Sequence, residues 1–392
     1  MKILHAIEFY SPSVGGAQEV VRQISQRLAA RGHDVTVATT RLTERTSKTI
    51  GEVTVKEFAV AGNSVRGIRG EPYRYQDFLL GGDFDVVMSY AAQQWTTDLL
   101  LPLVDRLPYA SVLAPCGFSG LHQRAYAGYF RSLPERLSHF DALVLHSDAY
   151  QDARFVREAG LNYDVIPNGA GADEFAQARP GFRAKYGITD DTPLLLTVGG
   201  HTGLKGHALL INAFKRARLK KAVLVVIGNT PTGRGCHSTC KARSTWTNLR
   251  SRDKRVLLLD PPREEVLAAY QAADLFVLSS KIECSPLVLF EALAAHTPFL
   301  TVDVGNAIEI ASWSGGGVVI PSRRDRRGYT TVKAAVLAEE IEALLADRTR
   351  LAQLGSAGYE AWRKRFTWER IVQQYEQVYE RAIAAHGNGD RP

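Results

Sequence analysis

The chain has 392 residues and a formal net charge of +7, with 45% hydrophobic and 23% charged residues. That length favours two domains over one core, and the composition is that of a soluble globular protein. No apolar run approaches the roughly 20 residues that cross a bilayer, and the first residues show no signal-peptide pattern. Four cysteines, Cys116, Cys236, Cys240 and Cys284, give no disulfide framework. We therefore expect a cytoplasmic protein.

Basic residues gather at 66–74, 215–221, 241–255 and 323–327. Such stretches are consistent with an ordinary solvated surface. They are equally consistent with a surface that attracts the phosphates of a nucleotide or of an anionic membrane face. No known nucleic-acid-binding module is present, so nucleic acid is not an expected partner.

Strand-like and helix-like segments alternate through the first half, which predicts α/β layering. Gly32 is suited to cap the end of the first helix, and a strand follows at once, so the chain opens as a βαβ unit. The expected strands are 2–7, 34–39, 53–58, 85–89, 109–114, 142–146 and 163–166. The expected helices are 16–31, 94–104, 132–138 and 149–159.

The loop Ser11–Gln18 follows the first strand and opens the first helix. Gly15 and Gly16 let the backbone approach a ligand closely, and the following amides can meet an anion. A purely structural turn explains these glycines equally well. The pattern G-x-G-x-x-G is absent, which argues against a dehydrogenase.

Pro167-Asn168-Gly169 predicts a sharp turn. A loop-rich stretch follows, with a short helix near 182–186, and we place the domain boundary there: 1–170 and 171–367. The alternation then restarts, so we expect two doubly wound units that bind ligand at the carboxyl ends of their strands. Expected strands are 193–198, 222–227, 255–259, 274–278 and 298–302. Expected helices are 206–218, 263–272, 286–296 and a terminal one at 367–381.

A glycine-rich loop after strand 193–198 contains Gly199, Gly200, Lys205 and Gly206. A lysine between glycines after a strand is a plausible counter-charge for a diphosphate. The alternative is an exposed loop lysine.

Cys236 and Cys240 lie in a polar, basic insertion at 231–252. Cys-x3-Cys beside a histidine could contribute to a zinc site, but the sequence offers no second ligand pair. Plain loop thiols, one local disulfide and a role in shaping ligand access remain open readings.

The most informative segment is 273–305, in which Glu283 and Glu291 stand eight residues apart across a Ser285-Pro286 turn. A buried strand ends, a short loop carries Glu283, and a helix begins near Ser285 or Pro286. The amides of that helix start can hold phosphates, and the two carboxylates can accept ribose and sugar hydroxyls. The bare pair alone could equally be a solvated helix face.

This E-x7-E segment resembles the donor site of the retaining glycosyltransferases of family 4, which have the GT-B fold. Pro12–Gly16, the Pro-Asn-Gly turn, Lys205-Gly206 and the terminal helix extend the resemblance along nearly the whole chain. It implies two Rossmann-like domains facing each other across a cleft, with helix 368–388 crossing back to the first domain.

The resemblance implies a role for each site residue. Lys205 would stabilise the leaving phosphate together with amides near Ser285, Pro286, Leu287 and Val288. Glu283 would position the transferred sugar, and Glu291 would hold the ribose. Gly15, Gly16, Gly199 and Gly200 would complete the donor site, without a metal or other cofactor.

Two positions depart from the family pattern. Gly200 stands where the family has arginine, so one cationic clamp is missing, and His201 or a nearby basic residue is expected to compensate. Cys116 stands where many relatives carry histidine. We expect Cys116 to line the sugar pocket without a chemical role; His122 is the alternative source of the polar contact, and a covalent cysteine mechanism is a weaker one.

The implied function is retaining transfer of a sugar from a nucleotide diphosphate sugar to the hydroxyl of a glycan or lipid-linked acceptor, in surface polysaccharide or glycolipid synthesis. Contact with an anionic membrane surface at its inner face is a further expectation. The alternatives are a GT-B relative that binds nucleotide sugar or glycan without turnover, and a nucleotide-sugar epimerase.

Overall fold

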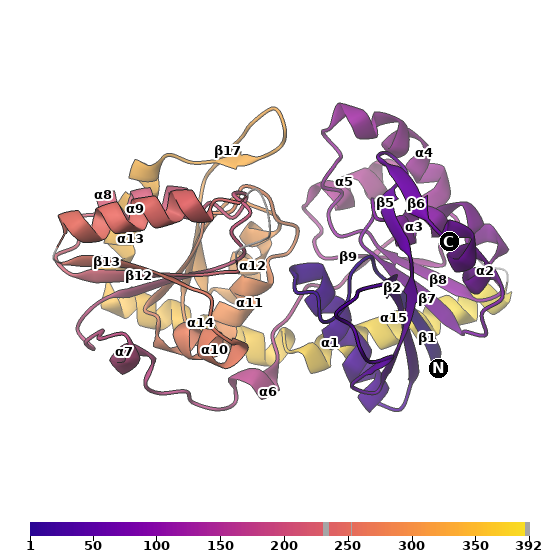
Figure 1. The fold of residues 1–392 in the computed structure, drawn as a ribbon, viewed down its shortest axis with the longest axis horizontal. Helices are drawn as coiled ribbons and strands as arrows, with labels where there is room; N and C mark the ends of the chain where they lie inside the picture. Colours follow the sequence, from indigo (N-terminus) through magenta and orange to yellow (C-terminus); the bar gives the residue numbers. More distant parts are fainter. Residues whose placement is uncertain (230–234, 252, 389–392) are drawn as a thin grey trace. The chain divides into compact units, whose positions relative to one another are not determined.

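The computed structural model describes residues 1–229, 235–251 and 253–388. The chain divides into two compact units (Figure 1). The N-terminal unit consists of Met1–Asn168 and the segment that begins at Trp368, and the C-terminal unit is Gly169–Thr367. Among the described residues, no helix has both the length and the apolar character that crossing a membrane requires.

The N-terminal unit is built on a sheet with the order β10-β9-β8-β7-β1-β2-β4-β3. Its neighbouring strands are parallel except at the edge, where β3 pairs antiparallel with β4. The strands are β1 (Lys2–Ala6), β2 (Asp34–Thr40), β3 (Thr49–Ile50), β4 (Val53–Phe58), β7 (Val86–Tyr90), β8 (Ala110–Ala114), β9 (Ala142–Leu145) and β10 (Asp164–Val165). A separate hairpin joins β5 (Val60–Asn63) to β6 (Gly67–Gly70).

The C-terminal unit has a parallel sheet with the order β13-β12-β11-β14-β15-β16. Counted from β11, this is the 3-2-1-4-5-6 order of a doubly wound dinucleotide-binding sheet. The strands are β11 (Leu194–Val198), β12 (Ala222–Ile227), β13 (Lys254–Leu259), β14 (Leu275–Leu278), β15 (Phe299–Val302) and β16 (Gly317–Ile320). The short strands β17 (Arg323–Arg324) and β18 (Thr330–Thr331) form a second, two-stranded sheet.

Helices alternate with the strands in both units. In the N-terminal unit they are α1 (Gly16–Ala30), α2 (Pro72–Leu80), α3 (Trp95–Leu100), α4 (Ala127–Leu137), α5 (Gln151–Glu158) and α15 (Trp368–Asn388), with 3-10 turns at Leu101–Arg106 and Arg124–Tyr126. In the C-terminal unit they are α6 (Ala172–Phe175), α7 (Phe182–Lys185), α8 (His207–Arg216), α9 (His237–Arg250), α10 (Arg263–Ala272), α11 (Leu287–Ala294), α12 (Ala307–Ser314), α13 (Ala334–Ala346) and α14 (Arg348–Arg365).

The central strands are covered on both faces, so they are apolar along their whole length rather than alternating. Every residue of β12, Ala222–Ile227, is buried. Its side chains divide between two clusters on opposite faces of the sheet, Val225 in one and Leu224 in the other. The two cores leave the loops at the strand ends as the places for ligand chemistry.

Helix α15 belongs to the N-terminal unit although it follows the whole C-terminal unit in sequence. Tyr375 and Tyr379 are completely buried, and the Tyr379 hydroxyl lies 3.0 Å from Nε2 of His5 in β1. On the surface, Arg27 of α1 forms an ion pair with Glu369 at 3.0 Å. The helix is therefore an integral part of this core.

Several elements differ from the expectation. The insertion at 231–252, expected to be a loop, is mostly helix α9; its residues 231–234 and 252 lie outside the described residues. Helix α4 begins at Ala127, earlier than expected. The hairpin β5–β6, helix α2 and the elements from α12 to α14 were not predicted.

Candidate functional site

The predicted donor residues of the C-terminal unit lie where its strand order reverses. Strands β11 and β14 are neighbours in the sheet, but β12 lies beyond β11 and β15 beyond β14. The loops that leave β11 and β14 therefore lead to helices on opposite faces of the sheet, and the carboxyl ends of strands at such a reversal are where doubly wound sheets bind ligands.

Backbone contacts fix these two loops to each other. The amide of Lys281 donates to the carbonyl of Leu204 at 2.7 Å, and the Ser279 hydroxyl donates to the carbonyl of Gly206 at 3.1 Å. Gly206 has φ +73°, and a Cβ there would lie 1.9 Å from the Ser279 carbonyl oxygen. Only glycine fits this close approach, so the position of Lys205 relative to the second loop is built into the backbone.

Lys205 and Glu283 form the central charged pair of the site. Nζ of Lys205 lies 2.7 Å from Oε1 of Glu283, and their side chains are 33% and 12% exposed. The aliphatic part of Lys205 crosses Gly199, where a Cβ would lie 3.3 Å from its Cγ. The ammonium is thus held at the strand reversal by packing as well as by charge, and the exposed third of the Lys205 side chain leaves it accessible to an anion.

Glu291 projects from α11 and pairs with Arg263 at 2.6 Å, with 13% of its own side chain exposed. Arg263, at the start of α10, also contacts Glu174 at 2.9 Å. Burial opposes charge on this guanidinium, but Glu291 and Glu174 raise the pKa of Arg263 above its ordinary value. Sequence reasoning missed Arg263, because nothing in the spacing connects it with Glu291.

The sequence predicts that this helix begins near Ser285 or Pro286, and in the structure α11 begins at Leu287. Pro286 is the N-cap with φ −70° and ψ 110°, and the first helical residue is Leu287. The buried Ser285 precedes it, while Leu287 and Val288 are partly exposed. The first amides of the helix therefore belong to Leu287 and Val288, directly after the loop that carries Glu283.

Gly200 is closely packed against the neighbouring loop. A Cβ at Gly200 would lie 2.7 Å from Oδ1 of Asn229. The prediction that His201 or a nearby basic residue compensates for the missing arginine stays a prediction. His201 is buried, and burial together with the nearby His237 lowers the pKa of His201, which disfavours a positive charge on this ring.

The expectation that Cys236 and Cys240 lack a second pair of metal ligands is wrong, because His201 and His207 lie beside them. His201, His207, Cys236 and Cys240 form a group whose potential ligand atoms all lie within 4.8 Å of one another. All four cysteines lie among the described residues, and none of them forms a disulfide bond. Its two histidines lie on either side of Lys205 in the sequence.

The remaining predicted residues belong to the N-terminal unit. Gly15 is the N-cap of α1 and Gly16 its first residue. Cys116 follows β8 with φ +57° and is partly buried, whereas His122 is exposed.

Sequence reasoning missed His146, a buried neighbour of Cys116. Its Nδ1 donates to the Ile166 carbonyl at 2.8 Å, and its Nε2 lies 2.8 Å from the Tyr90 hydroxyl. Burial works against the charged ring, but a hydrogen bond and the charge interaction with Cys116 raise the pKa of His146. The thiol therefore has a basic partner in this unit.

Two family descriptions match the chain in succession. "Glycosyltransferase Family 4" matches residues 14–174, and "Glycosyl transferases group 1" matches residues 178–361. A D-inositol 3-phosphate glycosyltransferase of Xylanimonas cellulosilytica is 30% identical over 62% of this chain and 57% of its own length. The chain thus aligns with little more than half of that relative. An N-acetyl-alpha-D-glucosaminyl L-malate synthase of Bacillus anthracis is 25% identical over 99% of this chain and 100% of its own length.

Solved structures share the fold. A sucrose-phosphate synthase of Thermosynechococcus elongatus has a TM-score of 0.79 at 21% identity, covering 98% of this chain and 99% of that one. The HepE protein of Anabaena, in complex with UDP-glucose, has a TM-score of 0.75 at 16% identity. The match covers 97% of this chain and 99% of that one. The predicted architecture of two Rossmann-like domains is confirmed.

Proposed function

Because the chain belongs to family 4 of the glycosyltransferases, we propose that it is a retaining enzyme that moves a sugar from a nucleotide diphosphate sugar to an acceptor hydroxyl. The observation that carries this proposal is the joined pair of loops at the strand reversal of the C-terminal unit. They bring Lys205 within 2.7 Å of Glu283, beside the start of the helix that carries Glu291.

The donor is a sugar joined to a nucleoside diphosphate. Lys205 carries the positive charge for the diphosphate, and the amides of Leu287 and Val288 add donors at a helix N-terminus. Glu283 accepts a hydrogen bond from a hydroxyl of the transferred sugar, and Glu291 from the ribose. The donor bound in the HepE complex supports this class, because that protein shares the fold.

The diphosphate enters a site that already holds an ion pair. Its oxygens exchange the Glu283 partner of Lys205 for a phosphate partner, which frees the Glu283 carboxylate for the sugar. The ammonium then faces the oxygen on which negative charge grows as the glycosidic bond breaks. Interactions of that kind lower the barrier because they strengthen toward the transition state.

The chemistry retains the configuration at the anomeric carbon. The bond from that carbon to the diphosphate oxygen breaks as the acceptor oxygen approaches the same face, and the acceptor proton passes to the departing phosphate oxygen. No protein base is required. We expect Lys205 and the α11 amides to neutralise the leaving diphosphate without a metal in the transfer step, so added Mg²⁺ should leave the rate unchanged.

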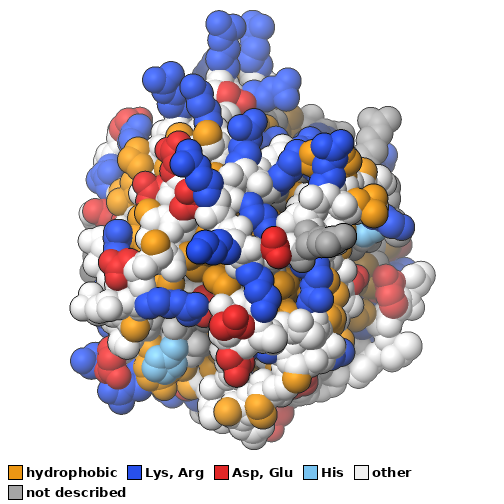
Figure 2. All heavy atoms as spheres, turned by 90° about the vertical axis from the view of Figure 1, so that its left-hand side faces the viewer, with side chains coloured by type: hydrophobic (Ala, Val, Ile, Leu, Met, Phe, Trp, Pro, Cys, Tyr) orange, Lys and Arg blue, Asp and Glu red, His pale blue; other side chains and the backbone are white. Residues whose placement is uncertain are grey.

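The acceptor is a glycan or lipid-linked saccharide at an anionic membrane face. Support comes from α9, where Trp246 is 41% and Leu249 81% exposed, and where Lys215 lies 3.4 Å from the Trp246 ring centroid. Figure 2 shows Lys and Arg side chains spread across this end of the C-terminal unit, with acidic ones among them. Exposed apolar groups beside basic ones suit an anionic interface. Flotation with phosphatidylglycerol vesicles, but not with phosphatidylcholine ones, is the expected result.

The decisive test separates transfer from binding. Purified protein is first screened by thermal stabilisation against nucleotides and nucleotide sugars; a ligand at one hundred times its Kd adds about 2.7 kcal/mol. The stabilising nucleotide sugars are then incubated with candidate acceptors. Release of nucleoside diphosphate that depends on the acceptor supports a transferase. Stabilisation without turnover would favour a binding protein, and conversion of the sugar nucleotide itself would indicate an epimerase.

A further inference from the structure

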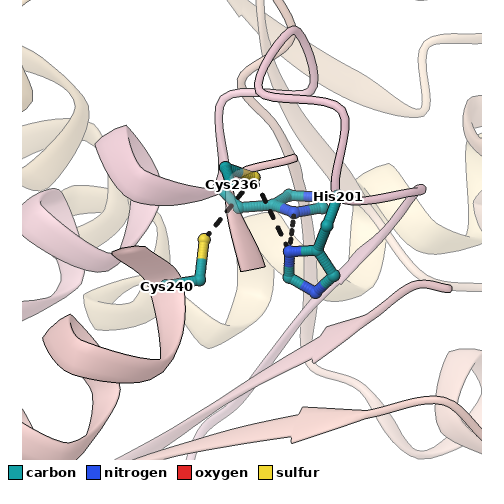
Figure 3. Close-up of side chains that lie close together, drawn as sticks. His201, Cys236 and Cys240 are labelled. Atoms are coloured by element: carbon teal, nitrogen blue, oxygen red, sulfur yellow. Dashed lines mark hydrogen bonds between the residues drawn. The ribbon is translucent and has the colours of Figure 1, made fainter. Parts of the chain in front are cut away.

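Two histidines that flank the Lys205 loop lie close to two cysteines at the start of α9. His201 lies in the loop after β11, and His207 is the first residue of α8. Cys236 is the N-cap of α9, and Cys240 is its fourth residue. Figure 3 shows His201, Cys236 and Cys240 pointing toward one another. His201, His207 and Cys240 are at most 1% exposed, and Cys236 is partly buried.

Three of the six distances among the potential ligand atoms fall in the range of a metal-binding tetrahedron, and all six are at most 4.8 Å. Nδ1 of His207 and Nδ1 of His201 are 3.3 Å apart, Sγ of Cys236 is 3.6 Å from Nδ1 of His201, and the two sulfurs are 3.7 Å apart. A tetrahedron edge is about 1.6 times its bond length, so zinc bonds of about 2.3 Å to sulfur and 2.0–2.1 Å to nitrogen place ligands about 3.3–3.8 Å apart.

Ordinary hydrogen bonding does not satisfy this group well. Two Nδ1 atoms that face each other can share only one proton, and Nε2 of His207 is buried without a hydrogen-bond partner among the described residues. An unsatisfied buried ring nitrogen is costly. Metal bonds to both Nδ1 atoms would replace the single shared proton, whereas Nε2 of His207 would carry the proton of the neutral ring and gain no partner from the metal.

The backbone supports the same arrangement. The amide of Cys236 donates to the carbonyl of His201 at 2.9 Å, which holds the start of α9 against the loop after β11. Cys236 and Cys240 are four residues apart, so one turn of helix directs both thiols to the same side. His201 is in turn fixed by its own amide, which donates to the carbonyl of Asn229 at 3.0 Å.

We propose that His201, His207, Cys236 and Cys240 bind one Zn²⁺ ion in a closed, structural site. Thiolate with imidazole is the ligand set that zinc prefers, and four protein ligands leave no open position for catalysis. Two thiolates balance the charge of the ion, and binding releases the two thiol protons to solvent. The site is separate from the transfer chemistry, which uses no metal.

The ion fastens the loop that carries Lys205. His201 and His207 lie on either side of the segment Thr202–Gly206, so one bound ion ties both of its ends to α9. This second part rests on the proposed function, because it concerns the residue assigned to the leaving phosphate. It predicts that loss of the metal weakens nucleotide binding through misplacement of Lys205.

The first test is metal content and Co²⁺ spectroscopy on the full chain. Protein purified without chelator should retain about one zinc per chain after dialysis. Metal-free protein titrated with Co²⁺ should develop the thiolate-to-cobalt absorption and the visible bands of a tetrahedral site. Cys240→Ser should lose both signals. His237→Ala removes a ring whose centroid lies 5.1 Å from that of His201 but which is outside the group, and Cys284→Ser removes an unrelated thiol; both should keep them.

Three results would overturn the proposal: no zinc retained by the wild-type protein together with no tetrahedral cobalt spectrum, unchanged metal binding in Cys240→Ser, or a Cys236–Cys240 disulfide in freshly purified protein. Neither metal readout depends on turnover, so a chain that binds zinc but transfers no sugar would contradict only the proposed function. Unchanged nucleotide affinity of metal-free protein would contradict the positioning of Lys205.

Discussion

Lys205 and Glu283 are 78 positions apart in sequence, yet their charged atoms lie 2.7 Å apart because β11 and β14 are adjacent strands. Their loops are joined by backbone hydrogen bonds as well, so the pair does not depend on the two side chains alone.

Replacing Lys205 by Ala should reduce turnover at least tenfold and leave the fold intact, because the leaving diphosphate loses its cation. Steady-state kinetics with the matched nucleotide sugar measures the change. Lys220→Ala, at an exposed position after α8, is the control and should behave as wild type. Full activity of Lys205→Ala would rule out the assigned role.

Replacing Glu291 by Ala should also reduce turnover at least tenfold, with a higher KM for the donor, because the ribose contact is lost. The change also leaves Arg263 with Glu174 as its acidic partner. Glu264→Gln alters an exposed carboxylate of the same region that pairs with Arg179 and should leave kinetics unchanged. A Glu291→Ala enzyme with normal KM and turnover would contradict the assignment.

Gly200→Ala should destabilise the C-terminal unit only slightly, since its Cβ would meet Oδ1 of Asn229 at 2.7 Å and this exposed side chain can turn aside. Asn229→Ala should relieve that contact, so the double variant should recover much of the loss, with a coupling energy of about 0.5–1 kcal/mol. Urea denaturation of the wild type, the two single variants and the double variant measures this double-mutant cycle. Strict additivity would show that the glycine is not required by this neighbour.

Cys116→Ser should reduce turnover less than tenfold, because a hydroxyl replaces the thiol as a partner for His146. Single-turnover measurements at saturating donor compare the chemical step directly. Complete loss of transfer in a folded Cys116→Ser protein would instead indicate that the thiol takes part in the reaction.

Stability of the N-terminal unit should fall as the pH falls from about 6.5 toward 3. Burial lowers the pKa of His5 to about 3, while an unfolded histidine has a pKa of about 6.5. The unfolded chain therefore binds more protons in that interval, and each such group contributes up to about 1.4 kcal/mol per pH unit. His5→Asn should show a shallower pH slope in urea denaturation. His139→Asn, at an exposed position, should keep the wild-type slope; equal slopes for wild type and His5→Asn would refute the explanation.

The donor loops could be predicted because each follows a local rule. A continuous apolar run ends, glycine or proline breaks it, and a helical period begins, so Lys205, Glu283 and Glu291 were each assigned to the correct kind of element. Arg263 could not be connected with Glu291 in this way, because their contact depends on how α10 and α11 pack. Helix α9 was missed because its sequence is polar and carries only a weak apolar stripe.

Only the two cysteines of the cysteine and histidine group could be recognised in the sequence as possible metal ligands. Cys236 and Cys240 have the spacing of one helical turn, but that signal means little until the segment is known to be helical. His201 and His207 flank the end of the β11 loop, and only the pairing of β11 with β12 places that loop beside the start of α9. A search for ligand pairs after adjacent parallel strands would have found both halves.

The place of α15 in the chain has a consequence for biosynthesis. The C-terminal unit is one uninterrupted segment, whereas the N-terminal unit needs Tyr375 and Tyr379, which the ribosome adds after all of Gly169–Thr367. The second half of the protein can therefore complete its core during translation while the first half still exposes the apolar surface that α15 will cover. Nascent chains stalled before Trp368 should be the species that chaperones bind.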